Sequence, residues 1–156
     1  MRALFAPVLA VLVLTFASGC ALAASGPQTG LPVEAITIDT KAGPHTFKVE
    51  VAADDESREI GLMFRKTMAP DAGMLFLYDR SQPVAMWMEN TYIPLDMLFI
   101  AADGHIVNIR QRAVPHSQEN IGSAGPVKAV LELNGGTVSR LDIKVGDKVA
   151  GPGLGQ

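Results

Sequence analysis

Apolar segments of strand length, separated by turn-forming residues, limit what this chain can fold into more than any other feature. Three of them are uninterrupted: "GMLFLY" (73–78), "VAMWM" (84–88) and "MLFIA" (97–101). Runs of this length are typical of strands that are covered on both faces, because a helix in a protein core is usually longer. They predict the central strands of a sandwich or a barrel.

Further strands are indicated by alternation of apolar and polar residues. "EAITID" (34–39) and "HTFKVEVA" (45–52) alternate and are separated by "KAGP", which predicts a hairpin. The turn at Asp103-Gly104 predicts a second hairpin, in which 97–101 pairs with the strand that follows it. "VKAVLEL" (127–133) also alternates, and "KVGDKVA" (144–150) has a Gly-Asp turn before a short last strand.

Two segments indicate helices. In "DDESREIGLMFR" (54–65), Asp54 or Asp55 is suited to the N-cap, and acidic residues follow in the first turn. Gly61 is unfavourable inside a helix, so we expect it near the C-terminal end or against a close neighbour. A second short helix is expected over 135–142. Seven or eight short strands with two short helices predict a mainly β, single-domain protein, either a β-sandwich or an irregular barrel.

The N-terminus has the pattern of an export signal. Arg2 is followed by an uncharged apolar run over 3–17 and then by small residues, so residues 1–23 are predicted to be a signal peptide. Two routes of processing stay open. "ALA" (21–23) fits ordinary signal cleavage, whereas "ASGC" fits lipoprotein cleavage before Cys20, which would then carry the lipid. After the signal we expect a linker over 24–32, the domain over 33–150 and a flexible tail over 151–156.

These features predict an exported protein, either free in the periplasm or anchored on the periplasmic side of the membrane through Cys20. That anchor is the one membrane contact we expect. Cys20 is the single cysteine, so no disulfide within the domain can stabilise it, and the apolar core must do so. The formal net charge of −3 and the lack of a basic cluster argue against a nucleic-acid partner.

The sequence resembles a known family over about residues 34–150. The segments "REIGLMFRKTMAPDAGMLFLYDRSQPVAMWMENTYIPLDMLFIAADGHIV" and "AVPHSQENIGSAGPVKAVLELNGGTVSRLDIKVGDKV" are similar to the bacterial and archaeal family called domain of unknown function 192. The resemblance implies a small, β-rich, often exported domain without an agreed activity. Relatives more often carry Lys at the position of Glu89, so a role for a positive charge there would not transfer. The family motif falls on Gly61, Leu62, Met63, Gly73, Met74, Met86, Trp87, Met88, Asn90, Thr91, Pro94, Asp96 and the "ELNGG" turn.

A polar stretch, Glu89-Asn90-Thr91, interrupts two apolar runs and is the candidate site. One interpretation is structural: Asn90, Thr91 and Asp96 hold the loop by hydrogen bonds to its backbone. The other is a surface for an unknown envelope ligand or partner protein, with aromatic rings for stacking and an arginine for an anionic group. That surface would comprise Arg65, Trp87, Asn90, Thr91, Tyr92 and Asp96.

Two further functions stay open. A hydrolase or lyase acting on envelope carbohydrate would use Asp96 as its acid/base group. Met86 and Met88, on one face of a strand, would offer two thioethers to Cu(I). The sequence has no G-x-S-x-G motif, and its three histidines do not have the spacing of metal ligands. We therefore expect a binding protein without catalytic residues or a cofactor, and a purely structural accessory domain is the remaining class.

Overall fold

The computed structural model describes residues 26–155. The predicted signal peptide and Cys20 lie outside the described residues, so export and lipidation stay predictions. No helix within 26–155 has the length and apolar character needed to cross a membrane. The elements are, in order, β1 (Val33–Thr40), β2 (Gly43–Ala52), α1 (Asp55–Ile60), β3 (Ala72–Gln82), β4 (Ala85–Met86), β5 (Leu95–Ile100), β6 (Ile106–Ala113), β7 (Ile121–Gly122), β8 (Val127–Asn134), α2 (Thr137–Arg140) and β9 (Lys148–Ala150).

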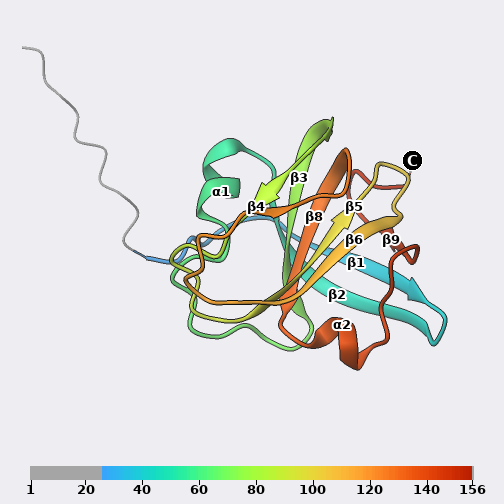
Figure 1. Cartoon of the computed structure of the whole chain (residues 1–156), viewed down its shortest axis with the longest axis horizontal. Coiled ribbons are helices and arrows are strands. Elements are labelled where there is room, and N and C mark those ends of the chain that lie inside the picture. Colours follow the sequence, from blue (N-terminus) through green and yellow to red (C-terminus); the bar gives the residue numbers. More distant parts are fainter. Residues whose placement is uncertain (1–25, 156) are drawn as a thin grey trace, which may run out of the picture.

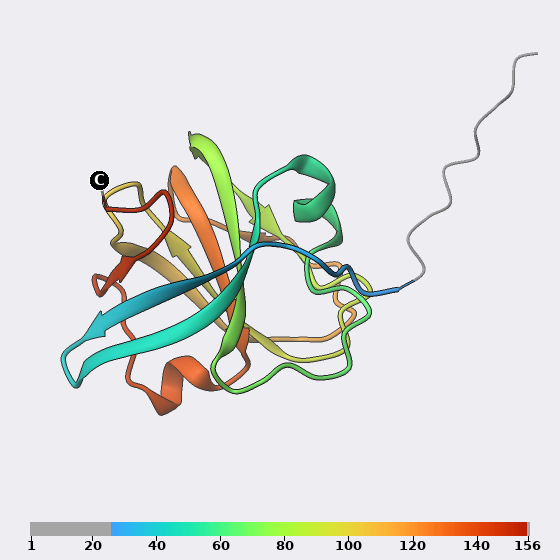
Figure 2. The same ribbon diagram turned by 180° about the vertical axis from the view of Figure 1, so that it is seen from behind.

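Seven strands form one sheet in the order β6-β5-β8-β3-β2-β1-β9, and this sheet curls into a half-barrel (Figure 1). Neighbouring strands are antiparallel except β2 and β3, which are parallel and joined by a crossover that carries α1. β4 and β7 form a separate two-stranded sheet. Seen from behind, the β1–β2 hairpin projects to one side, and the segment before β1 runs back toward α1 and the loops (Figure 2).

The two ends of the curled sheet approach each other at β6 and β9. His105 forms a bridge with Lys148, and the Ile106 N–H donates to the Asp147 carbonyl over 3.0 Å. These contacts join the first and last strands of the sheet order at one point, as in a barrel that is only partly closed.

Both faces of the central strands are covered, which explains the uninterrupted apolar runs. Leu75, Leu98 and Leu131 lie in one core cluster, together with residues of β1, β2, β9 and α2. Their neighbours along the same strands, such as Phe76 and Met97, lie in a second cluster on the opposite face, which is covered by Leu62, β4 and β7. The prediction of strands buried on both faces is confirmed for β3 and β5.

The mainly β fold class is confirmed, and of the two predicted arrangements the irregular barrel is the closer. The described residues contain nine strands instead of seven or eight, because the two-residue β7 is too short to give a pattern. The run "VAMWM" forms only β4. There Ala85 and Trp87 are exposed while Met86 and Met88 are buried, so this segment covers the second cluster and is not a member of the main sheet.

Both predicted helices are present but short. Asp54 is the N-cap of α1, where its side chain accepts from the Ser57 N–H and forms a capping box. Gly61 ends this helix with φ of +50°, and a Cβ there would lie 3.0 Å from Cζ of Phe76. Glycine is therefore needed for both reasons that the sequence suggested, the helix end and a close neighbour.

Gly73 on β3 gives a testable consequence of this packing. A Cβ at this position would lie 2.6 Å from the Glu132 carbonyl oxygen of β8 and 2.8 Å from Cδ2 of Leu133. The neighbouring backbone must move to admit a methyl group, so we expect Gly73→Ala to lower the free energy of unfolding by about 2 kcal/mol in urea denaturation. Gly122→Ala is the matched control, because nothing lies within 4 Å of the added atom. Equal midpoints for the two variants would contradict this account.

Candidate functional site

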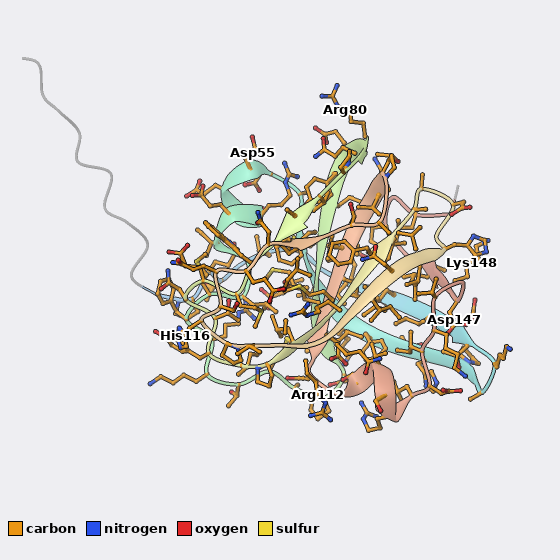
Figure 3. The ribbon with its side chains drawn as sticks, in the orientation of Figure 1. Asp55, Arg80, Arg112, His116, Asp147 and Lys148 are labelled. Carbon is orange, nitrogen blue, oxygen red and sulfur yellow. The ribbon has the colours of Figure 1, made fainter. Side chains whose placement is uncertain are left out.

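Asp96, a predicted site residue on β5, is completely buried. Its Oδ1 accepts from the Arg112 N–H at 2.8 Å, and its Oδ2 accepts from the N–H groups of Gly136 and Val138 at 2.9 and 2.8 Å. The carboxyl thus joins the end of β6 to the start of α2, beside which Arg112 lies (Figure 3). The structure places Asp96 in the interior instead of on a surface, and its hydrogen bonds go to β6 and α2 instead of to the backbone of the polar loop.

Asn90 and Thr91 also make backbone contacts. Asn90 is exposed with a left-handed φ of 52°, and its carbonyl accepts from the Phe64 N–H at 2.8 Å. Thr91 is 5% exposed, and its hydroxyl donates to the Glu89 carbonyl at 3.1 Å. The predicted polar stretch is therefore a tight corner that is held against the loop after α1.

A small crevice opens beside this corner, between α1 and β4, and we call it the Glu132 crevice. It has a volume of about 60 Å³. Residues 58–63 line one wall, and Met86, Trp87, Glu89 and Thr91 line the other. Phe76 of β3 and Glu132 of β8 come from the underlying sheet. Trp87, which is 45% exposed, and Thr91 are the two predicted site residues that the structure brings together here.

Glu132 is the functional candidate that the sequence analysis missed. It is 3% exposed, and it lies directly across from Met74 on β3 and Met97 on β5. Within 26–155 no hydrogen bond or ion pair involves its carboxyl, and burial raises the pKa of Glu132 from 4.5 to about 8. Such a group is mostly protonated at neutral pH and accepts or donates a hydrogen bond.

The charges around this carboxyl are unbalanced. Glu59 and Glu89 also line the crevice, whereas Arg58 is the single cation among its lining residues. The Arg58 guanidinium already donates to the Ala53 and Leu77 carbonyls, at 2.6 and 2.7 Å, and to Asp55 at 2.6 Å. The crevice is therefore acidic in character.

Comparison with known proteins identifies the family. The sequence matches the family DUF192, described as "Uncharacterized ACR", over residues 36–151. The chain belongs to the DUF192 family. No curated protein matches this DUF192 chain. The match extends from β1 to the residue after β9, so it includes the curled sheet and every residue that lines the Glu132 crevice.

Two solved structures are similar to this DUF192 domain. One, from Sinorhizobium meliloti 1021 and described as a candidate transcription regulator, is 52% identical, with a TM-score of 0.79 over 81% of this chain and 99% of that chain. The other, from Novosphingobium aromaticivorans DSM 12444, is a protein of unknown function. It is 39% identical, with a TM-score of 0.77 over 88% of this chain and 98% of that chain.

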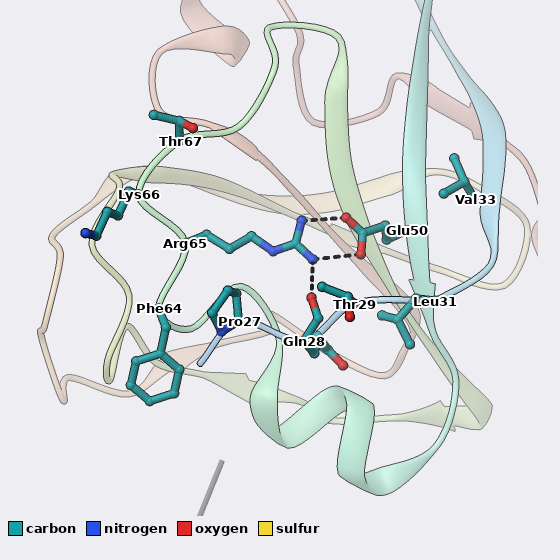
Figure 4. A pocket seen from close by; sticks show the side chains of 11 residues that line it. Pro27, Gln28, Thr29, Leu31, Val33, Glu50, Phe64, Arg65, Lys66 and Thr67 are labelled. Atoms are coloured by element: carbon teal, nitrogen blue, oxygen red, sulfur yellow. Dashed lines mark hydrogen bonds and ion pairs between the residues drawn. The ribbon is translucent and has the colours of Figure 1, made fainter. Parts of the chain in front are cut away.

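Arg65 of the DUF192 domain lines a different cavity, a groove of about 750 Å³ beside the N-terminal segment (Figure 4). Its guanidinium binds both carboxylate oxygens of Glu50, at 2.5 and 2.7 Å, and the Gln28 carbonyl at 3.1 Å. The Gln28 side chain donates to the carbonyls of Ser57 and Gly61, at 3.0 and 2.7 Å. The structure thus separates Arg65 from Trp87, and part of the predicted linker forms a wall of the groove.

Tyr92 lines neither cavity. It is 42% exposed, its ring packs edge-on against Phe64 with 6.3 Å between centroids, and its other neighbour is His116 at 5.2 Å. Tyr92 therefore presents an aromatic surface outside the Glu132 crevice.

The two methionines considered for Cu(I) belong to the second core cluster. Met86 is 9% exposed with its sulfur 3.9 Å from the Tyr78 hydroxyl, and Met88 is completely buried. Packing in an irregular core is a common role of methionine. Residues 26–155 contain no group of three or more His, Cys, Asp or Glu side chains that could hold a metal ion. The Cu(I) alternative stays a prediction.

Proposed function

We propose that this DUF192 domain is an exported binding domain, free in the periplasm or anchored at the periplasmic side of the membrane. It receives a small group of an envelope ligand or partner protein in the Glu132 crevice and performs no chemistry on it. One observation carries the proposal: a buried carboxyl without a hydrogen-bond partner among the described residues lines a crevice whose rim is an exposed tryptophan.

The cost of leaving Glu132 in this state supports a binding role. The carboxyl oxygens of Glu132 reach the crevice and are not fully enclosed, yet the residue is buried enough to raise the pKa of the carboxyl to about 8. A ligand group that hydrogen-bonds to the carboxyl offsets this desolvation. Trp87 at the rim adds a large, rigid contact surface with low conformational entropy. The crevice thus offers a polar contact inside and an apolar contact at its mouth.

The dimensions favour binding over hydrolysis of carbohydrate. Pockets for drug-sized ligands usually measure about 300–1,000 Å³, whereas this crevice measures about 60 Å³. Only a group of a few heavy atoms fits, so a sugar ring would stay outside. Asp96, the acid/base group of the enzymatic alternative, is buried with its carboxyl engaged by three backbone N–H groups. The carboxyl is therefore not placed to exchange protons with a substrate.

A nuclear magnetic resonance titration with small fragments tests the proposal. We would titrate ¹⁵N-labelled protein with amines, alcohols, amides and carboxylates of at most five heavy atoms. The indole N–H of Trp87, the single tryptophan, and the amides of Leu62 and Met63 report on the crevice. We expect at least one class to give saturable shifts confined to these signals.

Two variants make the result specific. We expect Trp87→Ala, followed through the Leu62 and Met63 amides, to weaken the binding roughly three- to tenfold, since an aromatic contact contributes about 0.5–1.5 kcal/mol. Tyr92→Ala is the matched control, because this ring is similarly exposed but lies outside the crevice, and it should bind as the wild type does. If no class gives saturable shifts, or if both variants lose affinity equally, the crevice is not the binding site.

A further inference from the structure

We infer that the group bound in the Glu132 crevice is a primary ammonium at the end of an alkyl chain, as in a lysine side chain. The inference rests on the proposed function and adds the chemical class of the ligand. It depends on three features that coincide in one place: acidic charge, apolar walls and a volume of a few heavy atoms.

The charged groups favour a cation. Three carboxyl groups line the crevice, from Glu59 of α1, Glu89 of the corner and Glu132 of β8. Arg58 opposes them, but one of its terminal nitrogens donates to two backbone carbonyls and the other is paired with Asp55. The remaining titratable neighbour is Tyr78 of β3, whose pKa burial raises, so that its phenol stays neutral. An incoming anion would meet carboxyl groups, whereas an incoming cation would meet a partner at each depth of the crevice.

The walls favour an alkyl chain that ends in this cation. Ile60, Met63, Phe76 and Met86 supply apolar surface, and Trp87 supplies a flat aromatic ring at the mouth. Aromatic rings attract ammonium groups through their quadrupole, most strongly when the ring is an indole. One buried water needs roughly 10–15 Å³ of such volume, so about 60 Å³ admits the nitrogen and two or three methylenes.

Binding of the ammonium releases a proton from Glu132. At neutral pH Glu132 carries a proton in the empty crevice, because its pKa is raised to about 8 by burial. The complex pairs R–NH₃⁺ with the Glu132 carboxylate, and the carboxyl proton leaves to the buffer. Below pH 8 each unit of pH therefore changes the apparent affinity about tenfold, with tighter binding at higher pH. The effect ends above pH 8, where the carboxyl is already ionised in the empty protein.

The test uses n-butylamine hydrochloride and its neutral counterpart, 1-butanol, with the fluorescence of Trp87 as the signal. We expect butylammonium to bind and its dissociation constant to fall about tenfold per pH unit from pH 6 to 7.5 and to level off by pH 8.5. The amine itself stays protonated over this range, since alkylammonium groups have pKa values of about 10.4. Calorimetry at pH 7 in buffers of different ionisation enthalpy should record the release of nearly one proton for each ligand bound.

Two variants and the comparison of the two ligands test whether the bound group is an ammonium. We expect Glu132→Gln to weaken butylammonium binding at pH 8 at least tenfold and to abolish the pH dependence. The control is Glu34→Gln on the exposed part of β1, which should bind as the wild type does. If 1-butanol binds more tightly than the amine, or if affinity falls as pH rises, the ligand is a neutral group and the ammonium class is wrong. Fragment binding at the crevice would then still support the proposed function.

Discussion

Replacement of Asp96 by alanine should lower the free energy of unfolding by about 4 kcal/mol. Hydrogen bonds to a charged group contribute about 1.5–3 kcal/mol each, and a buried donor that loses its acceptor is costly to desolvate. Asp96→Ala leaves three such donors without an acceptor, the N–H groups of Arg112, Gly136 and Val138. Urea denaturation followed by circular dichroism would measure the loss.

Two comparisons make this prediction specific. Asp39→Ala removes an exposed carboxyl from β1 and should change stability by less than about 0.5 kcal/mol. Asp96→Asn can keep the bonds from Gly136 and Val138 through its amide oxygen but turns its NH₂ group toward the Arg112 N–H, so it should destabilise the protein less than alanine does. If Asp96→Ala instead has the same urea midpoint as the wild type, the carboxyl does not hold β6 to α2. A functional role for Asp96 would then be the better interpretation.

Replacement of Glu132 by glutamine should have the opposite sign and should stabilise the protein at neutral pH. The pKa of this carboxyl is raised in the folded protein from 4.5 to about 8, so the folded state binds a proton that the unfolded state has lost. Stability therefore falls as pH rises from about 4.5 to 8, by roughly 1.4 kcal/mol per unit. Glutamine has nearly the same shape and no charge to desolvate, so the free energy of unfolding of the variant should not fall over this pH range.

The expected gain depends on pH in a way that identifies its cause. Urea denaturation should find Glu132→Gln more stable than the wild type by less than about 1 kcal/mol at pH 5 and by about 3 kcal/mol at pH 7. Glu34→Gln on the exposed part of β1 should show no such trend. Parallel curves for Glu132→Gln and the wild type would mean that the carboxyl titrates normally. A variant that is more stable and yet binds the ligand less well would be the trade-off expected of a binding site.

The fold could be predicted from the sequence to the extent that local patterns determine it. The β1–β2 and β5–β6 hairpins follow from alternation and turn residues, and α1 follows from Asp54 and Gly61. The curl of the sheet, the parallel pairing of β2 with β3 and the position of β8 between them and β5 depend on contacts between distant segments. No local pattern encodes such contacts, so the choice between sandwich and barrel stayed open.

The site was predicted in part, for a similar reason. The resemblance and the polar corner directed attention to Trp87 and Thr91, which do line the crevice. Glu132 escaped because "VKAVLEL" alternates, and alternation is usually a sign of a strand with one solvated face. Here α1 and β4 cover that face, so the same pattern buries an acid. Val130, which is completely buried and belongs to the covered face, was the available signal that this face is not solvated.

The strand order has a consequence for how the chain reaches this structure. β8 lies between β3 and β5 in the sheet, yet it comes after both of them in the chain. Until residues 127–134 have been synthesised, the earlier segments can form only two separate parts, the three strands β1, β2 and β3 and the β5–β6 hairpin, because the strand that connects them is missing. Assembly of the sheet therefore waits for nearly the whole polypeptide, and we expect a topology with so many pairings between distant segments to fold slowly.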